Sequence, residues 1–169
     1  MEFKDELKKY TERLETIKDT LQTEEATKMS LIVPFFQLLG YDVFNPLEFC
    51  PEYTADIGIK KGEKVDYAIL MDNEPVILVE AKSVNKKLDR HSSQLFRYFV
   101  STSAKFAVLT NGVEYKFYTD LDETNKMDKD PFLSINLLNL KDNEITQLSK
   151  FKKRNLNISE IMDSASLLK

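Results

Sequence analysis

Two acidic residues and a lysine stand where the sequence predicts neighbouring β-strands, and their types and spacing suit chemistry on a phosphate ester. Asp66 opens one apolar run, and Glu80-Ala81-Lys82 ends the next. Because side chains alternate across a strand, Glu80 and Lys82 share a face while Ala81 points the other way. Two carboxylates supply the hard oxygen ligands that Mg²⁺ prefers, and a lysine beside them can orient the attacking water or stabilise charge on the phosphate. The pattern therefore predicts a metal-dependent hydrolytic site.

The elements that would position these residues are a β-hairpin and the strands after it. Val65–Met71 and Val76–Ala81 are short apolar runs, and Asp72-Asn73-Glu74-Pro75 between them favours a turn that brings Asp66 opposite Glu80 and Lys82. The remaining elements are predicted as a helix over Ser92–Ser101, strands over Phe106–Thr110 and Val113–Tyr118 joined by Asn111-Gly112, and an edge strand at Phe132–Leu137. We expect a central mixed sheet of four or five strands with a helix on each face.

Two helices are predicted before the sheet. The first has apolar residues at every third or fourth position, namely Phe3, Leu7, Tyr10, Leu14, Ile17 and Leu21. This amphipathic helix either packs on the domain or binds a partner, and a second copy of the chain, giving a homodimer, is one such partner. The second helix lies within Thr23–Leu39 and ends at Gly40, and Pro34 within it removes a backbone donor and predicts a kink or a break.

The second helix offers a third acidic residue for the site. Its apolar stripe consists of Met29, Ile32, Phe36 and Leu39. Glu25 extends the stripe by one step, so we expect it to point toward the interior while Glu24 is rotated away. A carboxylate on a buried face is costly unless a charged group meets it. A surface position for Glu25 is the alternative, because one residue of rotation would expose it.

The composition favours one soluble globular domain over residues 1–169. Apolar residues make up 42% and charged residues 31% of the chain, which excludes a disordered polyelectrolyte. We expect the first helix at 1–22, a core at 23–120, and an edge strand with C-terminal helices at 131–169. A single cysteine, Cys50, excludes an internal disulfide, and a single histidine, His91, is expected in solvent at a helix start. The charged first residues and short apolar runs predict a cytoplasmic protein with no membrane span.

A basic stretch follows the predicted site and favours a polyanionic partner. Between residues 82 and 105 the one acidic residue is Asp89, and the basic residues are Lys82, Lys86, Lys87, Arg90, Arg97 and Lys105. The whole chain has a formal charge of −4, so this stretch is locally distinct. Contacts from such residues to phosphates give affinity for DNA without selecting a sequence. A solvated basic flank of a helix is the alternative.

The ordered set of motifs resembles a known family. Asp66 followed by Glu80-Ala81-Lys82 looks like the D…(D/E)xK signature of restriction-endonuclease-like nucleases. Glu25 in Thr23-Glu24-Glu25-Ala26-Thr27 is similar to the opening helix of the nuclease domain at the N terminus of type I restriction enzyme R subunits. Two further segments, Gln94-Leu95-Phe96-Arg97-Tyr98 and Leu109-Thr110-Asn111-Gly112, resemble the QxxxY motif and the strand-turn of that domain.

The resemblance implies an α/β, restriction-endonuclease-like core with a central mixed sheet flanked by helices, to which the N-terminal amphipathic helix and the C-terminal helices are added. It implies that Asp66, Glu80 and the Ala81 carbonyl hold Mg²⁺, with Mn²⁺ as a substitute. Lys82 would assist the attacking water, and Glu25 would act through a metal-bound water. The implied DNA contacts come from Lys86, Lys87, Arg90, Gln94, Arg97 and Tyr98, although Gln94 and Tyr98 are equally suited to a structural role.

Two functions from different classes follow from these residues. The first is a magnesium-dependent endonuclease that hydrolyses DNA phosphodiester bonds, with DNA and other restriction-modification or motor subunits as partners, since the sequence has no Gly-x-x-x-x-Gly-Lys-Ser/Thr phosphate loop. The second is a non-catalytic nucleic-acid-binding or assembly module on the same fold. The intact Asp66, Glu80 and Lys82 favour the first. An unrelated α/β domain is a third interpretation, and Asp56 is a rival acid that lacks a paired strand.

Overall fold

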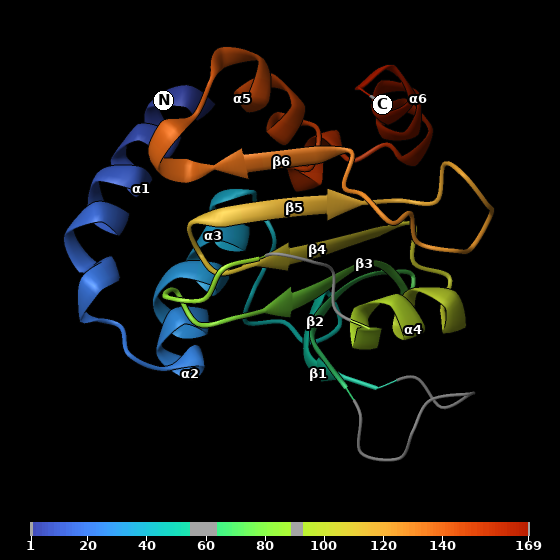
Figure 1. The fold of residues 1–169 in the computed structure, drawn as a ribbon, viewed down its shortest axis with the longest axis horizontal. Helices are drawn as coiled ribbons and strands as arrows, with labels where there is room; N and C mark the ends of the chain where they lie inside the picture. Colours follow the sequence, from blue (N-terminus) through green and yellow to red (C-terminus); the bar gives the residue numbers. More distant parts are fainter. Residues whose placement is uncertain (1, 55–63, 89–92, 169) are drawn as a thin grey trace.

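A six-stranded mixed sheet forms the centre of the computed structural model, which describes residues 2–54, 64–88 and 93–168 (Figure 1). The strands are β1 (Phe49–Tyr53), β2 (Val65–Met71), β3 (Glu74–Ala81), β4 (Phe106–Thr110), β5 (Glu114–Tyr118) and β6 (Leu133–Asn136). They lie side by side in chain order, and all neighbours are antiparallel except β3 and β4, which are parallel. The predicted α/β class, with a mixed sheet flanked by helices, is confirmed.

The sheet has six strands where four or five were predicted, and the strand that the prediction missed is β1. Its residues Phe49–Tyr53 include Pro51, which cannot donate a ladder hydrogen bond, and Glu52 has a positive φ of 52°. Proline within a sheet is confined to edges and bulges, and in the part of the chain that the structure describes β1 is an edge strand paired with β2. A short strand that contains proline and a glutamate lacks the continuous apolar run from which the hairpin strands were predicted.

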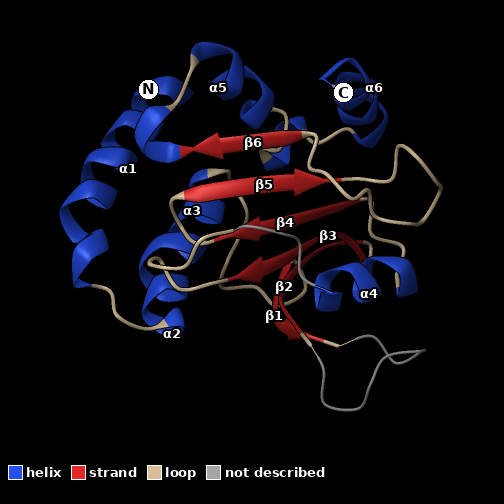
Figure 2. Cartoon of the chain, viewed as in Figure 1, coloured by secondary structure: helices blue, strands red, loops and turns tan. Residues whose placement is uncertain are grey.

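Helix α4 (Ser93–Ser101) connects the parallel strands β3 and β4 and covers one face of the sheet (Figure 2). Two strands can run parallel only if the chain crosses back between them, and here a helix makes the crossing. Its buried residues Leu95, Tyr98 and Phe99 pack in one cluster with Leu78 of β3 and Leu109 of β4. The helix predicted over residues 92–101 is therefore present, and it lies on the face expected to be opposite the second N-terminal helix.

The N-terminal helices cover the other face. In chain order they are α1 (Phe3–Ile17), the 3₁₀ turn η1 (Lys18–Thr20), α2 (Glu24–Thr27), the π-helical segment η2 (Lys28–Ile32) and α3 (Val33–Leu38). Leu7, Tyr10 and Leu14 of α1 are buried, so this helix packs on the domain, as the first of its two interpretations predicts. Phe35 of α3 stacks on Tyr115 of β5 with ring centroids 4.2 Å apart, which fixes α3 against the sheet.

The irregularity predicted at Pro34 takes the form of the π-helical segment η2, which ends two residues before it. Pro34 has no N–H, so the carbonyl of Ser30 loses its partner four residues on. Arg13 of α1 supplies that partner instead, with its Nη1 donating to Ser30 O over 3.0 Å, and the Tyr10 hydroxyl donates to Leu31 O. Side chains of α1 thus satisfy the carbonyls that the irregular turn exposes.

The C-terminal part consists of the 3₁₀ turns η3 (Leu137–Asn139) and η4 (Lys153–Asn155) and the helices α5 (Asp142–Ser149) and α6 (Ile158–Leu168). Helices α5 and α6 lie on the β6 side of the sheet (Figure 1). The C-terminal helices predicted within residues 131–169 are present as α5 and α6. Among the described residues no helix is long and apolar enough to cross a membrane.

Candidate active site

The β2–β3 hairpin places Asp66 and Glu80 at the same end of the sheet. Asp72 and Asn73 both have positive φ, 53° and 67°, which is the geometry of a two-residue type I′ turn. The turn is therefore tighter than the four residues predicted from the sequence. It sets a register in which Tyr67 pairs with Val79, and continuing that register by one residue brings Asp66 opposite Glu80. The hairpin itself is as predicted.

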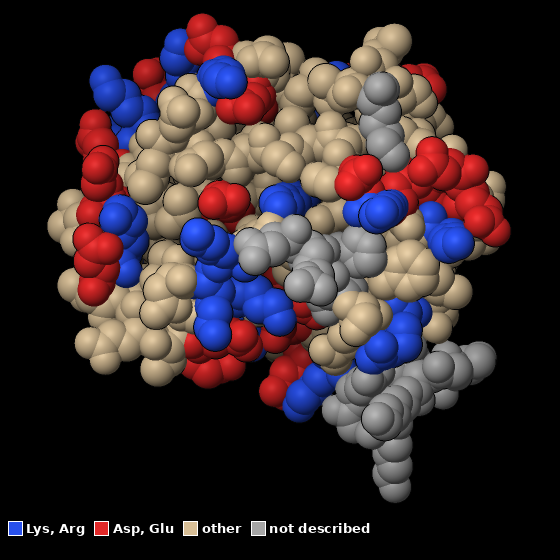
Figure 3. All heavy atoms as spheres, in the orientation of Figure 1, with Lys and Arg blue, Asp and Glu red and all other residues tan. Residues whose placement is uncertain are grey.

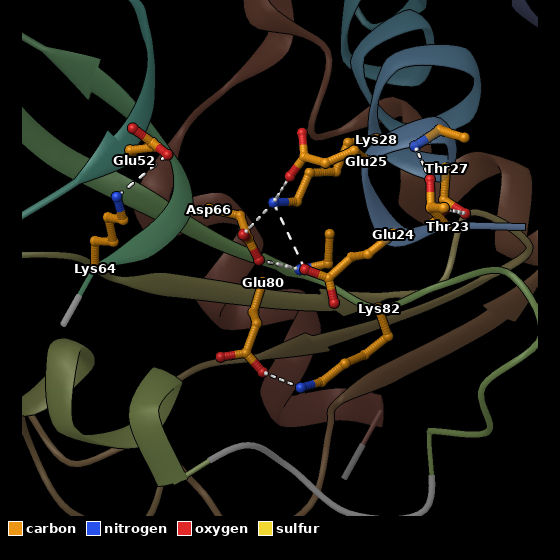
Figure 4. Close-up of polar contacts among 12 residues, drawn as sticks. Thr23, Glu24, Glu25, Thr27, Lys28, Glu52, Lys64, Asp66, Glu80 and Lys82 are labelled. Atoms are coloured by element: carbon orange, nitrogen blue, oxygen red, sulfur yellow. Dashed lines mark hydrogen bonds and ion pairs between the residues drawn. The ribbon is translucent and has the colours of Figure 1, made fainter.

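Glu80 and Lys82 extend on the same side of β3, as the alternation of a strand requires. Lys82 Nζ lies 3.6 Å from Glu80 Oε2, and the two side chains point toward one another in Figure 4. The Glu80 side chain is 6% exposed and that of Lys82 is 44% exposed. The backbone N–H of Lys82 donates to Thr110 O over 2.8 Å and so extends the β3–β4 pairing past Ala81. A rigid strand therefore holds an ammonium group that solvent can reach.

Both oxygens of Asp66 are engaged, and one partner is a lysine that the sequence motifs did not identify. Asp66 Oδ2 accepts from the backbone N–H of Ala81 over 2.7 Å, which ties β2 to β3 beside Glu80. Asp66 Oδ1 lies 2.7 Å from the Nζ of Lys28, the first residue of η2 (Figure 4). The signal in the sequence is weak, because Lys28 follows two acids at the i+3 and i+4 spacing that exposed helices also use.

The expectation that Glu25 points inward is wrong. Its side chain is 83% exposed, and Met29, expected on the same buried stripe, is 78% exposed. The reason is the π-helical segment. A π-helical turn contains one extra residue, so the residues that precede it are rotated by about one position relative to the apolar stripe that contains Phe36 and Leu39. The buried positions are Thr27 and Leu31 instead.

Glu25 nevertheless reaches the site through Lys28. Glu25 Oε1 lies 3.0 Å from Lys28 Nζ, and Glu24 Oε2 lies 3.7 Å from the same atom. Burial lowers the pKa of the Lys28 ammonium, but its hydrogen bonds to Asp66 and Glu25 outweigh burial and hold that pKa above its usual range. Lys28 is therefore a permanent cation at neutral pH.

The helix that carries Lys28 is fixed to the sheet by two local contacts. Buried Thr27 accepts from the backbone N–H of Val84 over 3.0 Å, which joins the helix to the loop after β3. Gly112 has a φ of 88°, and a Cβ on it would lie 2.8 Å from Leu31 Cδ1. Only glycine suits both the backbone conformation and this close approach. The helix that carries Lys28 therefore packs, through Leu31 and Thr27, on Gly112 of the predicted Asn111-Gly112 turn.

The residues predicted to contact DNA separate into two groups. Lys86 and Lys87 are exposed on the loop after β3, where Lys and Arg side chains gather at the centre of the face in Figure 3. They line a hollow of about 630 Å³ together with Lys18, Gln22 and Asn111. Arg97 is exposed on α4.

The predicted DNA contact of Tyr98 is wrong, because this side chain is fully buried in the core under α4. Gln94 donates from Nε2 to the carbonyl of Lys64 and so ties α4 to the start of β2, two residues before Asp66. The motif that contains both residues therefore supports the position of the site. Arg90, His91 and Asp56 lie outside the described residues.

The donor atoms suit a hard divalent cation. Asp66, Glu80 and the Ala81 carbonyl are oxygen ligands, as Mg²⁺ prefers, and substrate and water oxygens complete such sites. Within the described ranges, no three or more His, Cys, Asp or Glu residues form a group that could hold a metal ion. The two carboxylates and the carbonyl fit a cation that shares its coordination with a phosphate, and Asp66 Oδ1 would first have to leave Lys28.

Comparison with known proteins bears on the segment that contains this site. Residues 59–126 match the family model described as type I restriction enzyme R protein N terminus. No curated protein and no solved structure gives a significant match. The matched segment runs from before β2 to beyond β5 and includes Asp66, Glu80 and Lys82, whereas Lys28 and Glu25 precede it. The resemblance predicted from the motifs is thereby confirmed: over residues 59–126 the chain is similar to the N terminus of type I restriction enzyme R proteins.

Proposed function

We propose that this chain is a metal-dependent endonuclease domain that hydrolyses phosphodiester bonds in DNA. The observation that carries the proposal is the position of Glu80 and Lys82, paired at 3.6 Å on one side of β3, beside Asp66 of the adjacent strand. These three residues lie in the segment that matches the restriction enzyme family. Strand residues hold their side chains more rigidly than loop residues do, and rigid positioning is what hydrolysis of an unactivated phosphodiester requires.

Each residue has a role that its surroundings support. Asp66, Glu80 and the Ala81 carbonyl would hold Mg²⁺, for which Mn²⁺ can substitute. When bound, the cation supplies Lewis acidity and lowers the pKa of a coordinated water. Lys82, with its exposed ammonium, orients the attacking water or stabilises the growing charge on the phosphate. Glu25 faces solvent beside Lys28, where it can hold a water at the edge of the site.

The DNA backbone is proposed to pass over the loop after β3. Lys86 and Lys87 are exposed there, and Arg97 extends the basic surface onto α4. Such contacts neutralise phosphates and position the duplex without reading bases. The printed description of the matched family concerns an R protein of a restriction enzyme, so we propose other subunits of a restriction-modification system as partners. A cytoplasmic location stays a prediction.

Nicking of a supercoiled plasmid in Mg²⁺ or Mn²⁺ tests the proposal. Wild-type protein should nick the plasmid, EDTA should stop the reaction, and Lys82→Ala should lower the rate by roughly 100-fold or more, the usual effect of losing a group that stabilises the transition state. Lys64→Ala is the matched control, because Lys64 is a half-exposed lysine beside β2 that pairs with Glu52 at 3.2 Å. The control variant should retain the wild-type rate.

The alternative is a non-catalytic nucleic-acid-binding or assembly module, and one observation favours it. Lys28 occupies Asp66 Oδ1, an oxygen that a metal-dependent enzyme needs. A wild-type protein that binds the plasmid but does not nick it with either metal would establish this alternative. Asp66→Asn sharpens the distinction, because a nuclease should lose cleavage through this change while its metal-free DNA binding persists.

A further inference from the structure

Lys28 is a cation placed among carboxylates at the edge of the candidate active site. Its side chain is 13% exposed, and its ammonium lies 2.7 Å from Asp66, 3.0 Å from Glu25 and 3.7 Å from Glu24. The residue comes from the opposite side of the sheet to α4, and the close-up shows it reaching across to β2 (Figure 4). Lysines on helix surfaces ordinarily extend into solvent, so this placement needs a reason.

The irregular helix supplies the geometry. Lys28 is the first residue of the π-helical segment, and such segments interrupt α-helices mostly at functional sites. The rotation that exposes Glu25 and Met29 is the same rotation that turns Lys28 toward Asp66. Thr27 and Leu31 then anchor the turn against the Val84 loop and Gly112. The local structure is therefore arranged around the Lys28–Asp66 contact.

We propose that Lys28 is a positioning residue that occupies Asp66 in the metal-free protein and must leave Asp66 Oδ1 before a divalent cation can bind there. This inference rests on the proposed nuclease function. Lys28 would keep Asp66 oriented in the absence of metal, and its charge would set how tightly the cation is held.

The distances explain why the two cations compete. The ammonium lies 2.7 Å from Asp66 Oδ1, and a Mg²⁺ ion bound to that oxygen would lie at about 2.1 Å. The two cations would then be within about 5 Å of each other, where like charges in a partly buried site repel strongly. The other oxygen of Asp66 already accepts from Ala81 N–H, so one of its two lone pairs is taken, and a cation bound there would still lie near the Lys28 ammonium.

Glu24 and Glu25 give the displaced ammonium a place to go. Both carboxylates already lie within 3.7 Å of Lys28 Nζ, and both are more exposed than Asp66. A small rotation of the lysine side chain away from Asp66 would keep its ion pairs with the helix acids. The displacement therefore leaves no charge without a partner, which makes it a reversible exchange rather than a local unfolding.

Equilibrium Mn²⁺ binding to the full chain, measured by calorimetry without DNA, tests the proposal. Lys28→Met keeps most of the unbranched side chain and removes its charge, so it should bind Mn²⁺ at least about tenfold more tightly than wild type, since a repulsion of about 1.4 kcal/mol is tenfold in affinity. Lys28→Gln is the second variant, in case Lys28→Met folds poorly. Lys28→Arg restores the cation and should return the affinity to near the wild-type value.

The control is Lys153→Met, which removes another long-range ion pair, Lys153 with Glu48 at 2.5 Å, outside the site. It should leave Mn²⁺ affinity unchanged. Equal affinity in wild type, Lys28→Met and Lys28→Gln would overturn the role of Lys28 and leave the nuclease proposal standing. Weaker binding in both variants would overturn it too, because it would mean that Lys28 assists the metal. If wild type and every variant fail to bind Mn²⁺ both without DNA and with a short duplex present, the metal-dependent function fails together with this inference.

Discussion

Two acid–lysine pairs lie at the end of the β2–β3 hairpin that is opposite its turn. They differ in the elements that supply the residues, in the N–O distance and in the exposure of the ammonium. Asp66 and Lys28 come from elements far apart in the sequence, lie 2.7 Å apart and enclose an ammonium that is largely buried. Glu80 and Lys82 come from one strand, lie 3.6 Å apart and leave the ammonium open to solvent. In Figure 4 the first pair bridges a helix to the sheet, whereas the second stays on β3.

The difference shows how position assigns separate tasks to the same two side-chain types. A short, shielded pair between distant elements stabilises their packing, because breaking it leaves a buried charge without its partner. A longer pair on one strand, with its ammonium open to solvent, adds less stability, even though its carboxylate is buried. Its lysine is available to a phosphate at small cost. The first pair therefore suits a structural and regulatory task, and the second suits contact with substrate.

Gly112→Ala should break the first pair and leave the second in place. The new Cβ would meet Leu31 Cδ1 at 2.8 Å on a backbone with φ of 88°, so the helix that carries Lys28 must shift. We expect a loss of roughly 2–4 kcal/mol in the free energy of unfolding, from overpacking and backbone strain together. Urea unfolding followed by circular dichroism measures it.

Gly40→Ala is the control for the backbone term. Gly40 has a φ of 100°, but a Cβ there would lie 3.6 Å from the nearest atom, an ordinary contact. It should lose only about 1–2 kcal/mol, the cost of a left-handed alanine. An equal decrease in the free energy of unfolding for the two variants would mean that the contact between Gly112 and Leu31 does not hold the helix that carries Lys28.

Substituting each lysine by methionine measures the two pairs directly. Lys28→Met should lower the free energy of unfolding by about 1–2 kcal/mol, because Asp66 loses a charged hydrogen-bond partner in a partly buried place. Lys82→Met should lower it by less, about 0.5–1 kcal/mol, because the pair is 3.6 Å long and its ammonium is half-exposed, while the Glu80 carboxylate it leaves behind is buried. A larger loss for Lys82→Met than for Lys28→Met would reverse the assignment of tasks.

The pH dependence of that difference follows from the raised pKa of Lys28. A lysine whose pKa is raised by folding contributes its full stability below its usual pKa of 10.5, and the contribution is lost as pH rises through the folded value. The difference in the free energy of unfolding between wild type and Lys28→Met should therefore be the same at pH 7 and pH 9, as far as it depends on the charge of Lys28. Urea titrations at the two values show whether the ammonium stays charged.

Local patterns were enough to predict the fold and one of the two pairs. The apolar runs Val65–Met71 and Val76–Ala81 with a polar turn between them predict the hairpin, and the alternation of side chains along a strand puts Glu80 and Lys82 on one side. The helices were predictable for the same reason, since their apolar residues recur with the helical period. Elements with a regular apolar pattern were therefore predictable. Strand β1 was not, because it is short and interrupted by Pro51.

The other pair depends on facts that no local pattern contains. A π-helical turn rotates the start of the second helix, so the stripe read from Phe36 and Leu39 mispredicts Glu25 and hides Lys28. Packing of that turn on Gly112 decides the rotation, and such packing joins residues distant in sequence. Tyr98, predicted to contact DNA, is another case, because it is buried against sheet residues such as Leu78 and Leu109 that are distant from it in the sequence.

The smallest expected effect concerns the surface that each pair faces. The Glu80–Lys82 pair leads into the basic loop with Lys86 and Lys87, whereas the Asp66–Lys28 pair leads to Glu24 and Glu25, so a DNA backbone should pass on the Lys82 side. Replacing Lys86 and Lys87 together by alanine should weaken all duplexes about equally and lower the slope of log affinity against log salt by up to about two units, roughly one for each lost phosphate contact.

Lys8 and Lys9, exposed neighbours on α1, give the matched control for this double variant. Their replacement by alanine removes the same net charge from another element, so it should leave the slope within a few tenths of a unit of the wild-type value. Fluorescence anisotropy of a labelled duplex in EDTA, at several salt concentrations, measures both variants without cleavage. Equal slopes for the two variants would show that DNA responds to the net charge of the chain alone, and the basic loop after Lys82 would then have no special part in binding.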